Sequence, residues 1–344
     1  MEVIFQLLNT LYVQSQGAYL HLDHDTLKVE IDRVPRLQLP LHHLGGLVVF
    51  GNVSLSPFLI HRFAEDGRSV VWLDQNGQFR ARLAGPVSGN VLLRRAQHEA
   101  YQDEDRRTAL GRRFVAGKIR NARHVVLRGM RDNPGLAPQL EPCARELDTA
   151  LKEVNNSEDL DEIRGIEGRA AVVYFSALKS LILVEEPSFK FEVRSKRPPR
   201  DPVNALLSFA YTLLANECIS ACESVGLDPQ IGYLHALRPG RPALALDLME
   251  EFRSFFADRL VLTLLNRRQI TPKDFIERPG GAIYLTEGAR QLFLEAYQKR
   301  KQEEVAHPLL GQKVPLGLLP HVQARLLARH LRGDAAEYAP FVAR

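Results

Sequence analysis

One carboxylate in this sequence lies where helical periodicity predicts an apolar side chain. An apolar stripe at helical spacing predicts a single helix with one buried face, and Glu167 falls in the middle of that face. The stripe consists of Leu160, Ile163, Glu167, Ala170, Ala171, Tyr174 and Leu178. Burying an unpaired ionised carboxylate is costly even after the protein relaxes. The fold must therefore bring a cation, a strong donor or a proton to Glu167.

Two places downstream could complete a site around such a carboxylate. His235 ends a Gly-Tyr-Leu-His segment just before the Pro/Gly-containing turn at residues 238–242. Asp247 and Glu250 are three residues apart, so they are neighbours if the segment is helical, and they repel each other unless a cation lies beside them. Two or three carboxylates and one imidazole are the residue types of a divalent-metal site.

Composition sets broad limits on what this chain can be. With 344 residues, 45% of them apolar, it can form two domains with sizeable cores. The net charge of +4 permits a polyanionic partner without predicting one. Three cysteines are too few for a disulfide framework, and neither a signal peptide nor an uncharged run long enough for a membrane span is evident. We therefore expect a cytoplasmic protein.

The sequence pattern changes from short β-rich runs, which end near residue 76, to helical periodicity. Short β-rich runs at 11–22, 27–31, 47–50 and 70–73, with one helix at 56–66, predict a small β domain over residues 1–76. A Gly-rich stretch at 77–89 is the predicted linker. Helical periodicity dominates residues 90–344, where one helix is expected to begin at Asp201-Pro202 and stop by Gly226. The predicted class is α+β: a small N-terminal β domain followed by a larger, all-α C-terminal domain.

Basic residues are concentrated in two parts of the predicted α domain. Arg194, Lys196, Arg197 and Arg200 lie within seven residues, in a Pro-containing segment that cannot be a helix interior. A second group lies in the helical region between residues 94 and 123. A solvated loop or helix face explains each group taken alone, but their number favours nucleic acid, because backbone binding needs many Lys and Arg contacts.

The order of these segments resembles the CRISPR-associated spacer-acquisition integrases, which are the endonucleases of the adaptation complex, and among them the subgroup of type I-C systems. Four segments in one order carry the match: RGIEGRAA at residues 164–171, RPPRDPVNALLSFAY at 197–211, GYLH at 232–235 and DLMEEFR at 247–253. The resemblance covers nearly the whole chain, because this family joins a small N-terminal β domain to a larger α domain.

The resemblance implies that Glu167, His235 and Glu250 are catalytic residues that bind Mg²⁺ or Mn²⁺, with Asp247 as a supporting or alternative ligand. Carboxylate oxygens suit either ion, and an imidazole ligand favours Mn²⁺ over Mg²⁺. No cysteine belongs to these motifs, which counts against structural zinc.

The resemblance also implies a substrate and partners. The substrate would be a short DNA duplex with free 3′-hydroxyl ends, inserted by transesterification into the first repeat of a CRISPR array. The protein would be a homodimer formed largely through its N-terminal domains, in a heterohexameric complex with a small ferredoxin-like partner. Candidates for DNA contact are Arg194, Lys196, Arg197, Arg200, Arg238 and Arg241, and candidates to line the site are Asn204, Ser208 and Tyr211.

Several of these residues also have purely structural interpretations. Taken alone, Glu167 would be a buried carboxylate paired with an arginine or held in a hydrogen-bonded network, and His235 would be a loop or core histidine. Lys118 and Asn121 match a family pattern, with a packing or capping role as the alternative to DNA contact. The apolar run at 47–50 could be an edge strand that pairs across a dimer, or a central strand of its own sheet.

Two other functions would use the same residues. A hydrolytic metal-dependent nuclease acting on DNA or RNA in repair needs the same ligands, with water in place of the 3′-hydroxyl. A non-enzymatic DNA-binding scaffold needs Glu167 only as an ion-pair partner, and it predicts that Glu167→Gln leaves metal binding unchanged.

Overall fold

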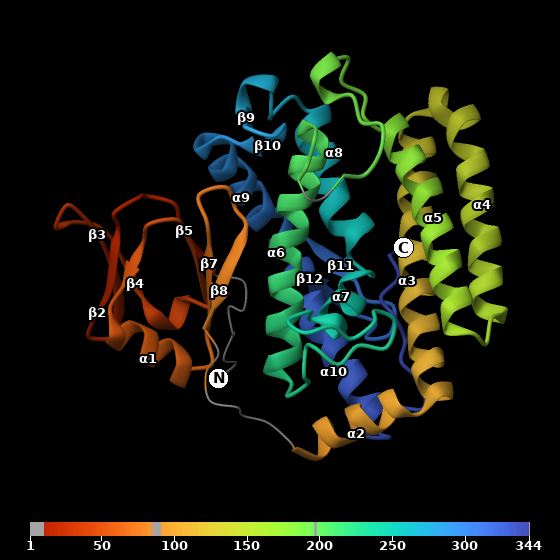
Figure 1. Ribbon diagram of the computed structural model, residues 1–344, viewed down its shortest axis with the longest axis horizontal. Coiled ribbons are helices and arrows are strands. Elements are labelled where there is room, and N and C mark those ends of the chain that lie inside the picture. The colour runs from red at the N-terminus through yellow and green to blue at the C-terminus, as the bar shows by residue number, and fades with distance from the viewer. Residues whose placement is uncertain (1–9, 84, 86–90, 196–197, 344) are drawn as a thin grey trace. The chain divides into compact units, whose positions relative to one another are not determined.

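The computed structural model describes residues 10–83, 85, 91–195 and 198–343, and the chain forms two compact units (Figure 1). The first unit comprises Met1–Ser88 and Leu285–Gln302, and the second comprises Gly89–Tyr284 and Glu303–Arg344. Strands dominate the N-terminal part and helices dominate the C-terminal part, so the predicted α+β class is confirmed.

The first unit is built on two four-stranded sheets. The first sheet has the order β1 (Thr10–Val13), β5 (Gly46–Phe50), β7 (Ser69–Leu73), β8 (Phe79–Arg82). The second has the order β4 (Val34–Pro40), β3 (Thr26–Ile31), β2 (Tyr19–Asp23), β6 (Ser54–Leu55). Apolar side chains from both sheets form one core with helix α1 (Pro57–Glu65). The helix predicted at 56–66 is thus present, and the Ser56 hydroxyl caps it by accepting from the Leu59 amide.

Strand β5 lies in the centre of its sheet. It pairs in parallel with β1 on one side and with β7 on the other, and all five of its residues are buried. A strand buried on both faces requires a continuous apolar run, which Leu-Val-Val-Phe supplies. The interpretation of this run as an exposed edge that pairs across a dimer is therefore wrong.

Two segments differ from the predicted domain plan. Strand β8 lies inside the stretch predicted as linker and pairs antiparallel with β7, with Val71 opposite Arg82. Its side chains are mostly exposed, so no apolar run marked it as a strand. Helix α9 (Glu287–Gln302) belongs to the first unit, where Gln298 Nε2 donates to the Thr10 carbonyl at 3.0 Å. Residues 84 and 86–89 of the predicted linker lie outside the described residues.

The second unit is mostly helical. Its α-helices are α2 (Val91–Gln102), α3 (Glu104–Asp132), α4 (Ala137–Asn156), α5 (Leu160–Ser180), α6 (Pro202–Ser224), α7 (Ala243–Met249), α8 (Arg259–Asn266) and α10 (Leu319–Leu331). Helices α3, α4 and α5 pack side by side (Figure 1). Two short hairpins interrupt the helices, β9 (Phe275–Arg278) with β10 (Ala282–Leu285) and β11 (Glu304–Ala306) with β12 (Lys313–Pro315). One π-helical turn, η4 (Arg253–Asp258), precedes α8, and 3₁₀ turns lie at Leu41–His43, Pro134–Leu136, Pro187–Phe189, Pro272–Asp274 and Leu316–Leu318.

Helix α6 begins where its sequence predicts. The Asp201 carboxylate accepts from the Asn204 amide at 2.8 Å, Pro202 occupies the first turn, and the helix ends two residues before Gly226. By length and composition α6 could cross a membrane, but 61% of its apolar window is buried inside the protein, as in a core helix.

Candidate functional site

Glu167 and Lys118 face each other from neighbouring helices. Glu167 lies on α5, and Lys118 lies near the middle of α3. The Lys118 ammonium pairs with Glu167 Oε1 and also lies 2.8 Å from Glu250 Oε2. The cation that the helical stripe required for Glu167 is therefore a lysine, and this lysine is shared between two carboxylates.

Glu250 lies in a turn between α7 and the π-helical turn η4, and it is 2% exposed. Arg253 Nη2 lies 3.1 Å from Glu250 Oε1. Burial raises the pKa of the Glu250 carboxyl, but the charges of Arg253, Lys118 and His235 outweigh burial and hold this pKa well below its ordinary value. Glu250 is therefore ionised at neutral pH, as a metal ligand must be.

Asp247 holds the segment that carries His235. Its Oδ2 accepts from the Tyr233 and Leu234 amides at 2.6 and 3.0 Å, and its Oδ1 accepts from the His235 amide at 3.0 Å. His235 Nδ1 lies 2.6 Å from the same Oδ1 and must donate, because an ionised carboxylate only accepts. The imidazole is thus fixed with Nε2 directed to the site, 3.7 Å from Glu250 Oε1. Asp247 is fully buried and its oxygens are occupied, so it orients His235.

Gly232 allows the His235 segment to approach α7. A Cβ at this position would lie 2.5 Å from the Ala243 carbonyl carbon and 2.7 Å from Asp247 Oδ2. On its other side the segment is tied to α2, where Gln97 Nε2 donates to the Ile231 carbonyl at 3.0 Å. The loop that presents His235 is therefore held from two sides.

The side chains around Lys118 fit a divalent cation. Glu250 Oε2 is buried, and the Lys118 ammonium lies 2.8 Å from it. Two carboxylates and an imidazole are suitable ligands for Mn²⁺ or Mg²⁺. Within the described residues, no three acidic, histidine or cysteine side chains are placed to bind one ion together. In this structure the Lys118 ammonium lies between Glu167 and Glu250.

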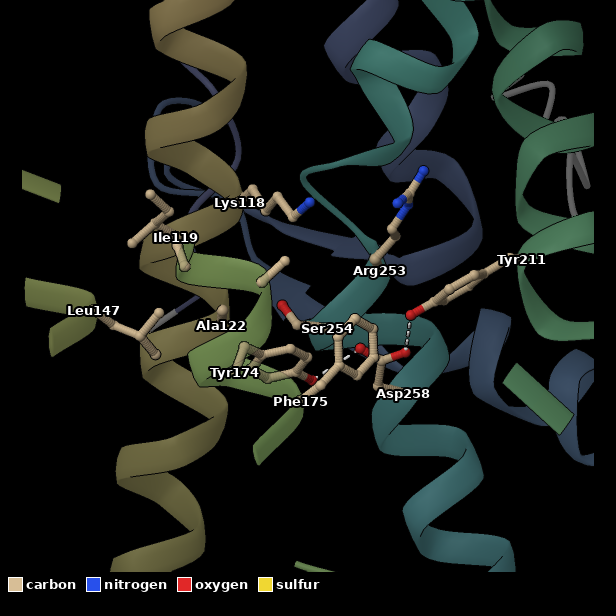
Figure 2. Close-up of a pocket in the computed structure, with 12 residues that line it drawn as sticks. Lys118, Ile119, Ala122, Leu147, Tyr174, Phe175, Tyr211, Arg253, Ser254 and Asp258 are labelled. Carbon is tan, nitrogen blue, oxygen red and sulfur yellow. Dashed lines mark hydrogen bonds between the residues drawn. The ribbon is translucent and has the colours of Figure 1, made fainter. Parts of the chain in front are cut away.

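A pocket beside this site is lined by Lys118 and Arg253 and by a hydrogen-bonded group around Asp258 (Figure 2). The Tyr174 and Tyr211 hydroxyls donate to the two Asp258 oxygens at 2.8 and 2.7 Å. The Arg253 guanidinium lies over the Tyr211 ring, 5.3 Å from its centroid. Asp258 therefore positions a tyrosine that supports the arginine paired with Glu250.

We expect Asp258→Asn to flatten the pH dependence of stability. Burial raises the pKa of Asp258 to about 6, although hydrogen bonds from Tyr211 and Tyr174 oppose this shift. The contribution of this carboxyl is complete below its unfolded pKa of 3.8 and is lost as pH rises through 6. Relative to Asp258→Asn, the wild type should lose about 2 to 3 kcal/mol of unfolding free energy between pH 4 and 7. Parallel curves for the two proteins in urea unfolding would contradict this prediction.

The residues predicted to contact DNA are placed differently from one another. Arg200 and Arg238 are exposed. Arg241 is half-buried; burial, together with the neighbouring charge of Arg238, lowers its pKa. Arg194 points inward, where it donates to Asn204 Oδ1 at 2.7 Å and to Ser208 Oγ at 3.1 Å. Lys196 and Arg197 lie outside the described residues.

The three residues predicted to line the site have distinct positions. Tyr211 lines the pocket with Lys118 and Arg253. Asn204 is fully buried and ties the preceding loop to α6, since its Nδ2 donates to the Val193 carbonyl at 2.8 Å. Ser208 accepts from Arg194 and so belongs to the same packing arrangement.

Three groups that the structure brings to this region have no role in the predictions from sequence. Arg253 is three residues after Glu250, and this helical spacing could have identified the pair. Arg164 Nε donates to the Leu234 carbonyl at 2.8 Å and so braces the His235 segment. Asp258 lies in an apolar run, and no local pattern links it to tyrosines on two other helices.

The chain matches one protein family and its relatives over most of its length. The family described as CRISPR associated protein Cas1 matches residues 11–299. A CRISPR-associated endonuclease Cas1 1 of Moorella thermoacetica is 59% identical over 340 residues, covering 98% of this chain and 99% of the relative.

Two solved structures share the fold at 22% identity. One is a casposase bound to integration product, with a TM-score of 0.83 over 96% of this chain and 92% of that chain. The other is a Cas6-RT-Cas1–Cas2 complex, with a TM-score of 0.83 over 97% of this chain and 36% of the longer chain.

Proposed function

Because the chain belongs to the Cas1 family of CRISPR-associated endonucleases, we propose that it is a divalent-metal-dependent integrase that inserts short DNA fragments into a CRISPR array. The reaction is transesterification: a 3′-hydroxyl of the incoming duplex attacks a phosphodiester at the repeat, and the old strand's 3′ end leaves. The observation that carries this proposal is the Lys118 ammonium between Glu167 and Glu250, because a cation is already stabilised where two carboxylates meet.

Glu167, His235 and Glu250 are the residues that would hold Mg²⁺ or Mn²⁺. When bound, the ion would lower the pKa of the attacking hydroxyl and stabilise negative charge on the scissile phosphate. Arg253 keeps Glu250 ionised, and Asp247 keeps the imidazole oriented with Nε2 toward the site. With an ion bound by Glu167 and Glu250, Lys118 would be able to pair with a phosphate oxygen instead of these two carboxylates.

Exposed cations around the site are the proposed contacts to the DNA backbone. Arg238 is exposed, and burial together with the charges of Arg238, Arg253 and Arg164 lowers the pKa of the nearby Arg241. Arg200 is also exposed and lies near Gly281, between β9 and β10. Such a concentration of cations attracts phosphates without reading sequence. The inward-facing Arg194 is left out of this group because its donors are bonded to Asn204 and Ser208.

We also propose the assembly that the family resemblance implies: a homodimer formed largely through the N-terminal β part, bound to a small ferredoxin-like partner in a heterohexamer. The shared fold with the Cas1 portion of a Cas6-RT-Cas1–Cas2 complex is consistent with a Cas2-like partner. The type I-C subgroup remains part of this proposal.

A strand-transfer assay tests the proposed function. Labelled duplex with free 3′ ends is incubated with a plasmid carrying leader and repeat, the small partner, and Mn²⁺ or Mg²⁺. We expect joined product that requires the ion. Metal-dependent cleavage without joining would replace the integrase with a hydrolytic nuclease, and DNA binding without any chemistry would leave only a scaffold.

A further inference from the structure

A short segment late in the chain, Tyr338–Ala343, packs against α3 and against the turn after α7, and we call it the strap. Asn121 on α3 is fully buried and binds the strap through its side-chain amide. Its Nδ2 donates to the Phe341 carbonyl at 2.8 Å, and its Oδ1 accepts from the Ala343 amide at 2.8 Å. The same Nδ2 donates to the Glu251 carbonyl at 2.7 Å. One side chain thus ties α3, the strap and the turn after α7 together.

Glu251 is a second residue that binds the strap through hydrogen bonds. Its carboxylate is fully buried and accepts from the Phe341 amide at 2.7 Å, from Gln323 Nε2 at 2.9 Å and from the Tyr338 hydroxyl. Two of these three donors belong to the strap. The conformation of the residue directly after Glu250 is therefore set by the strap.

Apolar packing reinforces these hydrogen bonds. The Phe341 ring is buried, with its centroid 6.2 Å from that of Phe252 and 5.5 Å from that of Phe255. Pro340 packs against α3 at Gly117, where an added Cβ would lie 2.8 Å from Pro340 Cβ and 3.4 Å from Glu251 Cγ. The strap and α3 approach this closely only because residue 117 is glycine.

We infer that the strap is a positioning element that sets the separation between Lys118 and Glu250, and through it the affinity of the ion site. Its contacts on α3, Gly117 and Asn121, flank Lys118 in sequence, and its contact Glu251 adjoins Glu250. Shifts of about 1 Å in supporting residues are large for a site that binds an ion or a reacting group. This inference rests on the proposed function, because it assumes that an ion is bound there.

Gly117→Ala tests the inference, because the added methyl group would collide with Pro340 of the strap without weakening helix α3. Alanine favours helix over glycine, so α3 itself gains stability. We expect the affinity for Mn²⁺, measured by electron paramagnetic resonance of the free ion, to fall about tenfold. The matched control is Gly168→Ala on α5, beside Glu167, where an added Cβ meets no atom within 4 Å. The control should bind Mn²⁺ within about twofold of wild type.

A second substitution separates positioning from a general structural effect. Pro340→Gly removes the Cβ that the new alanine would meet, so the double variant should recover Mn²⁺ affinity to within about threefold of wild type. Equal affinity of Gly117→Ala and Gly168→Ala would overturn the inference, as would a double variant that stays as weak as Gly117→Ala. Failure of the wild type to bind Mn²⁺ would instead overturn the proposed function, and this inference with it.

Discussion

Glu250→Gln is expected to abolish DNA joining, with a loss on the order of 10³-fold or more. Glutamine keeps the volume of the side chain but removes the charge that binds an ion. The carboxylate it replaces is buried and lies near Lys118, Arg253 and His235. The measurement is the initial rate of joined product at saturating Mn²⁺, with circular dichroism to confirm the fold.

The control for this variant is Glu153→Gln. Glu153 is exposed and pairs with Arg169 on the surface, so the loss of its charge should leave the joining rate within about twofold of wild type. If Glu250→Gln keeps more than about a tenth of wild-type joining, Glu250 does not have the role of a charged ligand in the chemical step.

Asp247→Ala should reduce both stability and ion affinity. The substitution leaves the amides of Tyr233, Leu234 and His235 without their buried acceptor, as well as the imidazole N–H. We expect the free energy of unfolding to fall by about 3 to 5 kcal/mol, because unsatisfied buried donors are costly. Mn²⁺ affinity should fall about 10- to 100-fold, because His235 loses the partner that orients it.

Asp334→Ala is the comparison for Asp247→Ala. Asp334 forms a surface pair with Arg332, which typically contributes less than about 1 kcal/mol. Urea unfolding and Mn²⁺ titration distinguish the two variants. A loss of affinity in Asp247→Ala without a loss of stability, or the reverse, would show that Asp247 does not serve both purposes.

Local sequence patterns predicted those elements of the fold that depend on residues close together in sequence. Ser56 and Asp201 cap α1 and α6 near the predicted positions. Most of the predicted stripe from Leu160 to Leu178 is buried on one face of α5, but Glu167 and Ala171 are only half-buried. Strand β8 was missed because its exposed residues carry no apolar signal. The placement of α9 depends on long-range contacts such as that of Gln298 with Thr10, which no local pattern contains.

The sequence indicates which charged residues belong to the site, but not how they are arranged in space. Glu167 is only half-buried, and its partner is Lys118, but no local pattern shows that Lys118 also reaches Glu250. The role of Asp247 depends on a loop that folds back onto α7, which sequence spacing does not reveal. The strap lies about 90 residues beyond Glu251 in sequence, so only the folded structure brings them together.

Mn²⁺ titration monitored by electron paramagnetic resonance tests most directly whether Glu167, His235 and Glu250 hold a divalent ion where Lys118 bridges two carboxylates. The titration compares the wild type with Glu167→Ala and His235→Ala. We expect one ion per chain in the wild type, with affinity lowered more than about 100-fold in each variant. Wild-type affinity in either variant would contradict the proposed ligand set.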